Sequence, residues 1–119
     1  MKQKLLYLLI FFWAFTANVW SQFPDTNWID YTIDFTQDVM NADNDGSPEK
    51  PWLLSDPGHL AFLAREVNKY ADKVFRYASY KLTGNINLNT HLWTPIGGKA
   101  TDDGIVSFKG VFDGDGYTV

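Results

Sequence analysis

The chain of 119 residues contains no cysteine, so neither a disulfide framework nor a cysteine-rich zinc site can stabilise it. Its only arginines are Arg65 and Arg76, and no stretch gathers lysine and arginine into a basic stripe. Because proteins hold phosphate backbones with clustered basic side chains, this shortage argues against nucleic-acid binding. Stability must come from apolar packing, for which the aromatic residues, 17% of the chain, supply the bulk.

The chain also lacks an apolar run long enough to cross a membrane. Leu5–Phe15 is apolar throughout, whereas a spanning helix needs about 20 residues. Lys2 and Lys4 precede this run and small residues follow it, which predicts a secretory signal peptide at residues 1–21, cleaved after Ser21. We therefore expect a secreted or cell-surface protein with no membrane span after cleavage. Loss of the two lysines would take the net charge from −4 to −6.

The first half of the mature chain contains two predicted strands, a loop and a helix. A short strand is expected around Tyr31 to Phe35 from its β-branched and aromatic content, and a second in the apolar run at 51–55. Turn-forming residues fill 41–51 and predict a loop between them. A helix is predicted over 57–70, with Ser55 or Asp56 as its N-cap, and four of its apolar residues share one face: Leu60, Leu63, Ala64 and Val67.

The second half shows alternation of apolar and polar residues, which is typical of extended chain with one buried face. The first alternation runs over 78–89, with Gly84 expected at a bend or bulge. The second begins at Val106, passes through Phe108 and Phe112, and resumes after the DGDG stretch. Pro95 and glycines break the chain between the two. The pattern predicts a mainly β class with one helix.

Three stretches in order resemble the amino-terminal region of bacterial secreted, adhesin-like proteins with GLUG repeats. They are GSPEKPWLLSDPGHLAFLAREVN (46–68), YKLTGNINLNTHLWTPIGG (80–98) and FKGVFDGDGYTV (108–119). The resemblance implies a right-handed parallel β-helix, of which this chain would supply the amino-terminal cap and the first coil or coils. Residues 22–50 would form an N-terminal strand and acidic loop, and residues 51–119 the capping helix and the start of the β-helix. The family's repeats normally follow the last stretch, so the solenoid is expected to be truncated at Val119.

The acidic loop carries a candidate calcium site. Asn41, Asp43 and Asp45, followed by Gly46, repeat the spacing of oxygen ligands in a calcium-binding loop. An EF-hand would need a bidentate glutamate at the position that Trp52 occupies. We therefore expect an Asx-rich turn without a cofactor, with calcium as the alternative.

A pair of aspartates, Asp113 and Asp115, alternates with Gly114 and Gly116 near the end of the chain. Two carboxylates can act as an acid–base pair, as in glycosidases. Glycines that accept positive φ explain the stretch more simply, as a corner between two coil strands. We favour the corner, and no catalytic residue is predicted.

The remaining candidates are aromatic or histidine side chains. Trp52 and Trp93 are suited to stack on sugar rings, although packing under the helix is the simpler explanation. His59 and His91 stand alone in the sequence, with no second histidine or cysteine at metal-ligand spacing. His59 is expected to face solvent near the start of the helix.

These observations favour a secreted or cell-surface, adhesin-like binding module without catalytic activity, whose partner is a surface glycan or a protein. The alternatives are a non-catalytic or partial segment of a carbohydrate-active β-helix protein, and a truncated product with no independent function. Because a solenoid needs about three stacked repeats, residues 22–119 alone are expected to be marginally stable or to self-associate through an open β edge.

Overall fold

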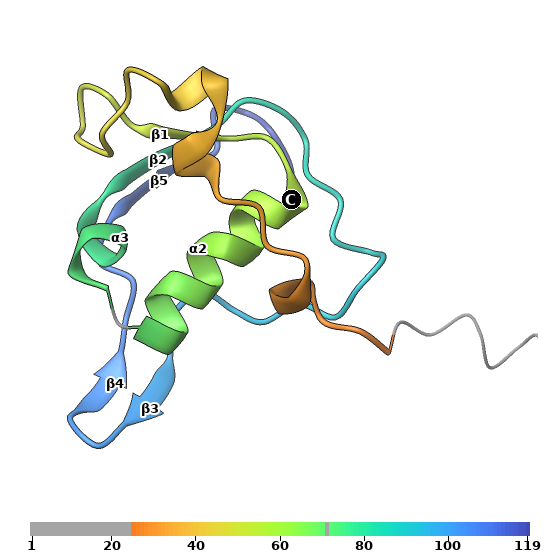
Figure 1. The fold of residues 1–119 in the computed structure, drawn as a ribbon, viewed down its shortest axis with the longest axis vertical. Helices are drawn as coiled ribbons and strands as arrows, with labels where there is room; N and C mark the ends of the chain where they lie inside the picture. Colours follow the sequence, from red (N-terminus) through yellow and green to blue (C-terminus); the bar gives the residue numbers. More distant parts are fainter. Residues whose placement is uncertain (1–24, 71) are drawn as a thin grey trace, which may run out of the picture.

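Most helices of the described chain precede most of its strands. The computed structural model describes residues 25–70 and 72–119, and the predicted signal peptide and its cleavage site lie outside them. None of the described helices is long and apolar enough to span a bilayer. The elements in chain order (Figure 1) are the 3₁₀ helices η2 (Trp28–Asp30), η3 (Phe35–Gln37) and η4 (Val39–Asn41), then β1 (Trp52–Leu54), α2 (Pro57–Tyr70), α3 (Lys73–Tyr77), β2 (Ser79–Leu82), β3 (Lys99–Thr101), β4 (Gly104–Val106) and β5 (Val111–Asp113).

The central sheet has three parallel strands in the order β1-β2-β5. Trp52, Tyr80 and Phe112 lie side by side across it. The helix α2 crosses one face of this sheet, and the antiparallel hairpin of β3 and β4 extends away from it (Figure 1). The buried residues between the sheet and α2 form the core, into which Phe35 packs from the amino-terminal segment.

The helix α2 confirms the predicted helix, because its determinants are local in sequence. The carboxylate of Asp56 accepts a hydrogen bond from the Gly58 backbone N–H at 2.7 Å and so caps the first turn. Leu60, Leu63 and Val67 are fully buried on the face that packs into the core. The strand expected at 51–55 is also present, as β1.

The predicted fold, a mainly β chain that begins a parallel β-helix, is wrong. The described residues form one three-stranded parallel sheet and a separate two-stranded antiparallel sheet, not a solenoid. In a β-helix each coil contributes strands to several stacked sheets, but residues 83–98 contain no strand of the central sheet, and the strands are three or four residues long. In the sequence, the antiparallel hairpin of β3 and β4 lies between β2 and β5, where a coil was expected.

The strand expected around Tyr31 to Phe35 is also wrong. Asp34 instead caps η3, with its carboxylate accepting a hydrogen bond from the Thr36 backbone N–H at 3.0 Å. Such local side-chain bonds compete with extended structure and favour a tight helical turn. The turn directs Phe35 into the core, where none of its surface is exposed.

The alternation over 78–89 correctly predicts the buried apolar side chains, but not the burial of Ser79 or how far the strand extends. Tyr80, Leu82 and Ile86 are buried, and Leu88 is half-buried. Backbone pairing in the sheet ends at Leu82, although the Ile86 N–H still bonds to the Thr118 carbonyl at 2.9 Å. The alternation therefore reports an extended chain over the core, only part of which has strand neighbours.

The outer edge of β1 is closed by the side chain of Asn41 rather than by another strand. The amide of Asn41 accepts a hydrogen bond from the Leu53 N–H at 2.8 Å and donates to the Leu53 carbonyl at 3.0 Å. It also donates to the Phe35 carbonyl at 2.9 Å. The side chain is 1% exposed, so these bonds satisfy backbone groups that water cannot reach.

Replacing Asn41 by alanine is expected to lower the free energy of unfolding by about 2–4 kcal/mol, since backbone groups at Leu53 and Phe35 would lose their partner in a buried position. Urea denaturation of the variant and the parent protein measures this difference. Asn89→Ala, at an exposed position, is the matched control and is expected to change stability by less than about 0.5 kcal/mol. Equal losses in the two variants would contradict the structural role of Asn41.

Candidate functional site

The three residues of the candidate calcium site lie in different environments. The amide oxygen of Asn41 accepts bonds from the Leu53 N–H and from the Asn44 side chain, so both of its lone pairs are used. Asp43 is exposed, and Asp45 accepts a hydrogen bond from the Ser47 N–H at 2.9 Å. Hydrogen bonds from Ser47 hold the pKa of Asp45 below its usual value. Among the described residues, no three His, Asp or Glu side chains are arranged to hold a metal ion.

The DGDG stretch after β5 forms a tight turn. Asp113 accepts a hydrogen bond from the Asp115 N–H at 2.9 Å, and the Tyr117 N–H bonds to the Gly114 carbonyl. The positive φ values fall on Asp115 (47°) and Gly116 (79°). Because the fold contains no coils, this turn is not the predicted corner between two coil strands. It leads the chain back to Ile86 instead.

The carboxylates of Asp113 and Asp115 have different partners. The Asp115 carboxylate lies 3.6 Å from the ammonium of Lys81, while the Asp113 carboxylate holds the turn. Both are exposed, and neither shares a hydrogen bond with the other's carboxylate among the interactions of the described residues. The arrangement stabilises a turn and provides no acid–base pair facing a cavity.

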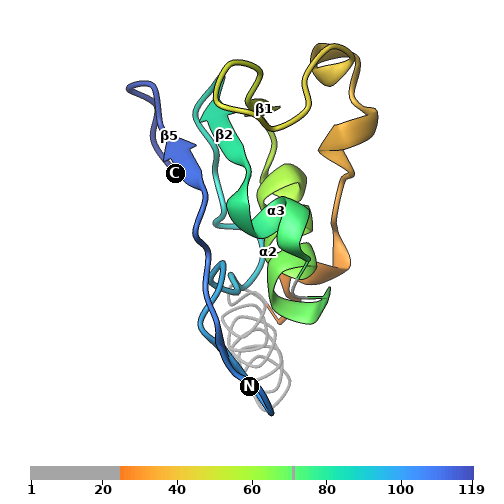
Figure 2. The ribbon, with the colours of Figure 1, turned by 90° about the vertical axis from the view of Figure 1, so that its left-hand side faces the viewer.

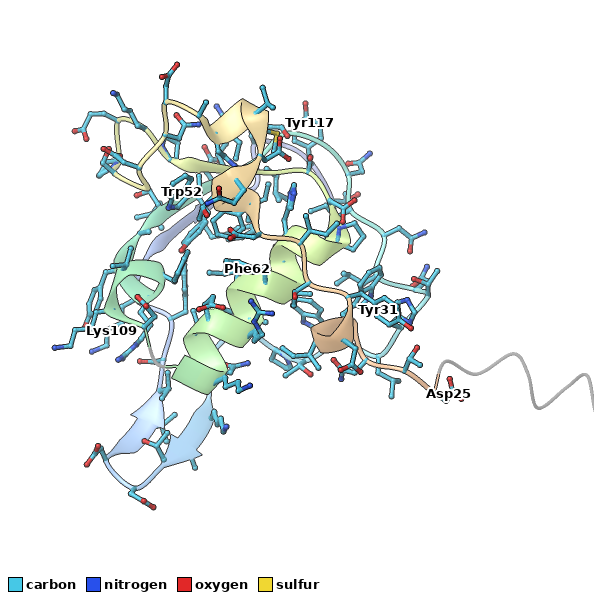
Figure 3. The ribbon with its side chains drawn as sticks, in the orientation of Figure 1. Asp25, Tyr31, Trp52, Phe62, Lys109 and Tyr117 are labelled. Carbon is cyan, nitrogen blue, oxygen red and sulfur yellow. The ribbon has the colours of Figure 1, made fainter. Side chains whose placement is uncertain are left out.

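Trp52 lies within the sheet and packs inward (Figure 3). Its ring packs against Phe35, with centroids 5.8 Å apart. A Cβ built on Gly46 would lie only 2.4 Å from the indole Nε1, so the backbone of this glycine, with φ of 79°, covers the edge of the ring. The indole N–H has no hydrogen-bond partner within the described structure. Trp52 is half-buried and packs against the hydrophobic core.

Trp93 lies in a different environment, at an open apolar hollow of about 260 Å³ beside β5. The hollow combines residues from α2, from the loop after β2 and from both sides of β5: Leu60, Leu88, Trp93, Ile96, Phe108, Phe112 and Val119. Phe112 remains 39% exposed and Val119 62% exposed. Of the tryptophans considered for binding, Trp93 is therefore the one beside a cavity open to solvent.

A second and larger hollow, of about 910 Å³, lies between α2 and the loop at 94–99. Asn68 fixes this loop by donating to the Pro95 carbonyl at 2.8 Å and accepting from the Gly97 N–H at 2.7 Å. Arg65, also in the lining, bonds to Glu66 and to the Thr32 hydroxyl. The lining of this larger hollow contains polar and charged side chains but no aromatic residue.

His59 is buried, contrary to the expectation that it faces solvent. Only 2% of it is exposed, and its ring meets that of Phe35 edge-on, with centroids 6.3 Å apart. Its Nδ1 accepts a hydrogen bond from the Ser55 N–H at 3.2 Å, and Nε2 lies 3.5 Å from the Asp38 carboxylate. Burial lowers the pKa of His59, while the nearby charges of Asp56 and Asp38 partly oppose this effect.

His91 lies in the segment between β2 and β3, and its ring packs against the amino-terminal segment. Its ring stacks on Tyr31 with centroids 4.0 Å apart, and Trp28 meets it edge-on. Its Nδ1 is hydrogen-bonded to the Thr26 hydroxyl. These contacts join the amino-terminal segment to the loop around residue 91, as does the backbone pairing of Asn27 with Leu92.

Comparison with protein-family models, with curated proteins and with solved structures found no match to this chain.

The stability of the protein is expected to depend on the protonation of His59. The pKa of His59 is lower in the folded state than in the unfolded chain, where it is about 6.5. Below about pH 6.5 the unfolded chain therefore takes up the proton first, and the contribution of His59 to stability, full at higher pH, is lost as the pH falls.

Urea denaturation at about pH 7.5 and pH 5.5 measures this loss in the parent protein and in His59→Gln. The variant should lose less stability between the two pH values, because its side chain does not titrate. The carboxylates, including Asp38 and Asp56, are common to both proteins and cancel in the comparison. An equal pH dependence in the two proteins would rule out His59 as its source.

Proposed function

We propose that this protein is a secreted or cell-surface binding module, without catalytic activity, that holds an apolar segment of a protein partner. The observation that carries the proposal is the open hollow at Trp93, where aromatic and aliphatic side chains remain accessible beside the edge of the sheet. Concave apolar surfaces with aromatic residues are the usual anchoring points of protein interfaces.

A protein segment suits this hollow better than a glycan. Apart from the indole N–H of Trp93, no side chain of the lining can form a hydrogen bond. A sugar ring presents several hydroxyl groups, which need polar partners when water is displaced. An aliphatic or aromatic side chain from a partner would bury the hollow without this cost.

The resemblance to secreted GLUG-repeat proteins supports the proposed location but not the fold. It covers the stretch that contains Trp93 and the stretch that contains Phe108 and Phe112. The predicted signal peptide is the independent support for export.

A glycan-binding segment of a carbohydrate-active protein is the second candidate. The larger hollow supports it, because Asp30, Arg65 and Asn68 offer polar groups to hydroxyls there. The two hollows are contiguous in sequence through Trp93, Thr94 and Pro95. A glycan array with the purified protein separates this candidate from the first.

Export is tested by expressing the full chain with a carboxy-terminal tag in a bacterial host and fractionating the cells. We expect the protein in the medium or at the cell surface, with Gln22 as its first residue on amino-terminal sequencing. An uncleaved protein confined to the cytoplasm would contradict the proposed location.

The binding site is tested by selecting peptides from a phage-displayed library on the full chain. Selected peptides should carry clustered apolar residues, and Trp93→Ala should weaken their binding about tenfold, since it removes much of the lining. Val74→Ala, which changes an exposed apolar residue on α3, is the control and should leave affinity unchanged. Peptides that bind Trp93→Ala and the parent equally would overturn the assignment of this hollow.

A further inference from the structure

The strand β5 has an open outer edge. The N–H groups of Lys109 and Val111 bond to the carbonyls of Arg76 and Ala78, on the side of β2. Because backbone groups alternate in direction along a strand, Phe112 directs its N–H and C=O groups away from β2. Gly110, at the bend before β5, has no backbone hydrogen bond to another described residue. In the described part of the structure β5 pairs with β2 alone, and it borders the sheet on the side away from residues 25–41 (Figure 2).

The opposite edge of the sheet is not available. Asn41 satisfies both backbone groups of Leu53 on β1, and η3 and η4 lie against that strand. Any strand added to this sheet must therefore pair with β5. Natural proteins protect edge strands with short length, charges, bulges or proline. β5 contains no proline, but it is only three residues long and ends in Asp113, so any pairing along it is short.

We infer that the partner of β5 is a second copy of this chain, paired edge to edge about a two-fold axis. A two-fold axis makes the two β5 strands antiparallel and brings the same surface of each copy into contact. The result is one continuous sheet through both molecules, in the order β1-β2-β5-β5-β2-β1.

The directions of the backbone groups restrict the register. Hydrogen-bonded pairs must come from Gly110 and Phe112, so Gly110, Val111 or Phe112 lies opposite its own copy. With Gly110 on the axis, Phe112 would pair with Phe108, which lies outside β5. With Phe112 on the axis, Lys109 would face Asp115. This residue is not extended, since its φ is 47°, and its carboxylate already forms an ion pair with Lys81. With Val111 on the axis, Phe112 exchanges hydrogen bonds with Gly110 of the second copy, and the pairing spans residues 109–113, where the single bend is at Gly110.

The register with Val111 on the axis is also complementary in charge. It places two valines, each 61% exposed in one copy, in contact at the axis. On either side of them, Lys109 lies opposite Asp113 of the second copy, so the interface contains two opposite-charge pairs. Both side chains are exposed, and Lys109 projects from the outside of the molecule near α3 (Figure 3). Opposite charges directly across an antiparallel pair stabilise it, and like charges oppose it.

The pairing is tested by sedimentation velocity on the mature protein over concentrations up to about 1 mM, since short edge pairings are weak. The parent protein should form dimers. Lys109→Asp and Asp113→Lys should each associate about tenfold more weakly, because each variant places like charges opposite one another twice. An equimolar mixture of the two variants should recover the dimer, since each pair across the axis again has opposite charges.

Two control variants and one further test variant complete the experiment. Lys99→Asp and Asp103→Lys make the same charge changes on the exposed β3–β4 hairpin and should leave association unchanged. Asp113→Asn keeps an oxygen to accept the Asp115 N–H, so it tests the charge with the turn intact, and it should weaken the dimer. A monomeric parent protein at all concentrations, single variants that associate as tightly as the parent, or a mixture no tighter than either variant would each overturn the inference. Peptide binding at Trp93 is measured separately, so the proposed function can fail without affecting this result.

Discussion

The pairing of the Asn41 side chain with the backbone of Leu53 is the constraint on which the arrangement of this protein depends. A primary amide carries one acceptor and one donor side by side, so it can replace the backbone of one residue of a neighbouring strand. Here it closes the edge of β1 and, through the Phe35 carbonyl, fixes the segment that precedes it. A three-stranded parallel sheet thus has one closed edge and one open edge.

The closed edge is also where the core is densest. Phe35 meets Phe62 and Tyr80 in edge-to-face contacts, with centroids 5.3 Å and 5.9 Å apart. Such contacts add to the burial of apolar area in a chain that has no disulfide. All three residues of β5 are exposed, whereas β1 and β2 contribute buried side chains, and both the Trp93 hollow and the unpaired backbone of Phe112 lie beside β5. The packed core around Phe35 and the proposed binding site at Trp93 thus lie towards opposite edges of one small sheet.

The features that the sequence predicted correctly depend on neighbours along the chain. The cap at Asp56 and the spacing of Leu60 and Leu63 determine α2, and alternation identifies the apolar side chains between 78 and 88 that face the core. Strand pairing depends on residues far apart, so the resemblance led to a β-helix where the chain forms a hairpin and a three-stranded sheet. The role of Asn41 was equally inaccessible, because an asparagine in an acidic, turn-forming segment reads as a solvated loop residue. The hollow could be anticipated only in part, from Phe108 and Phe112 sharing a face.

Amide hydrogen exchange, followed residue by residue by NMR in dilute solution, tests the central claim most directly. If Asn41 replaces a strand, the Leu53 N–H should exchange as slowly as the paired amides of β2, while the Phe112 N–H should exchange at nearly the rate of an unfolded chain. Rapid exchange at Leu53, or protection of Phe112 in the dilute monomer, would contradict a sheet with one closed and one open edge.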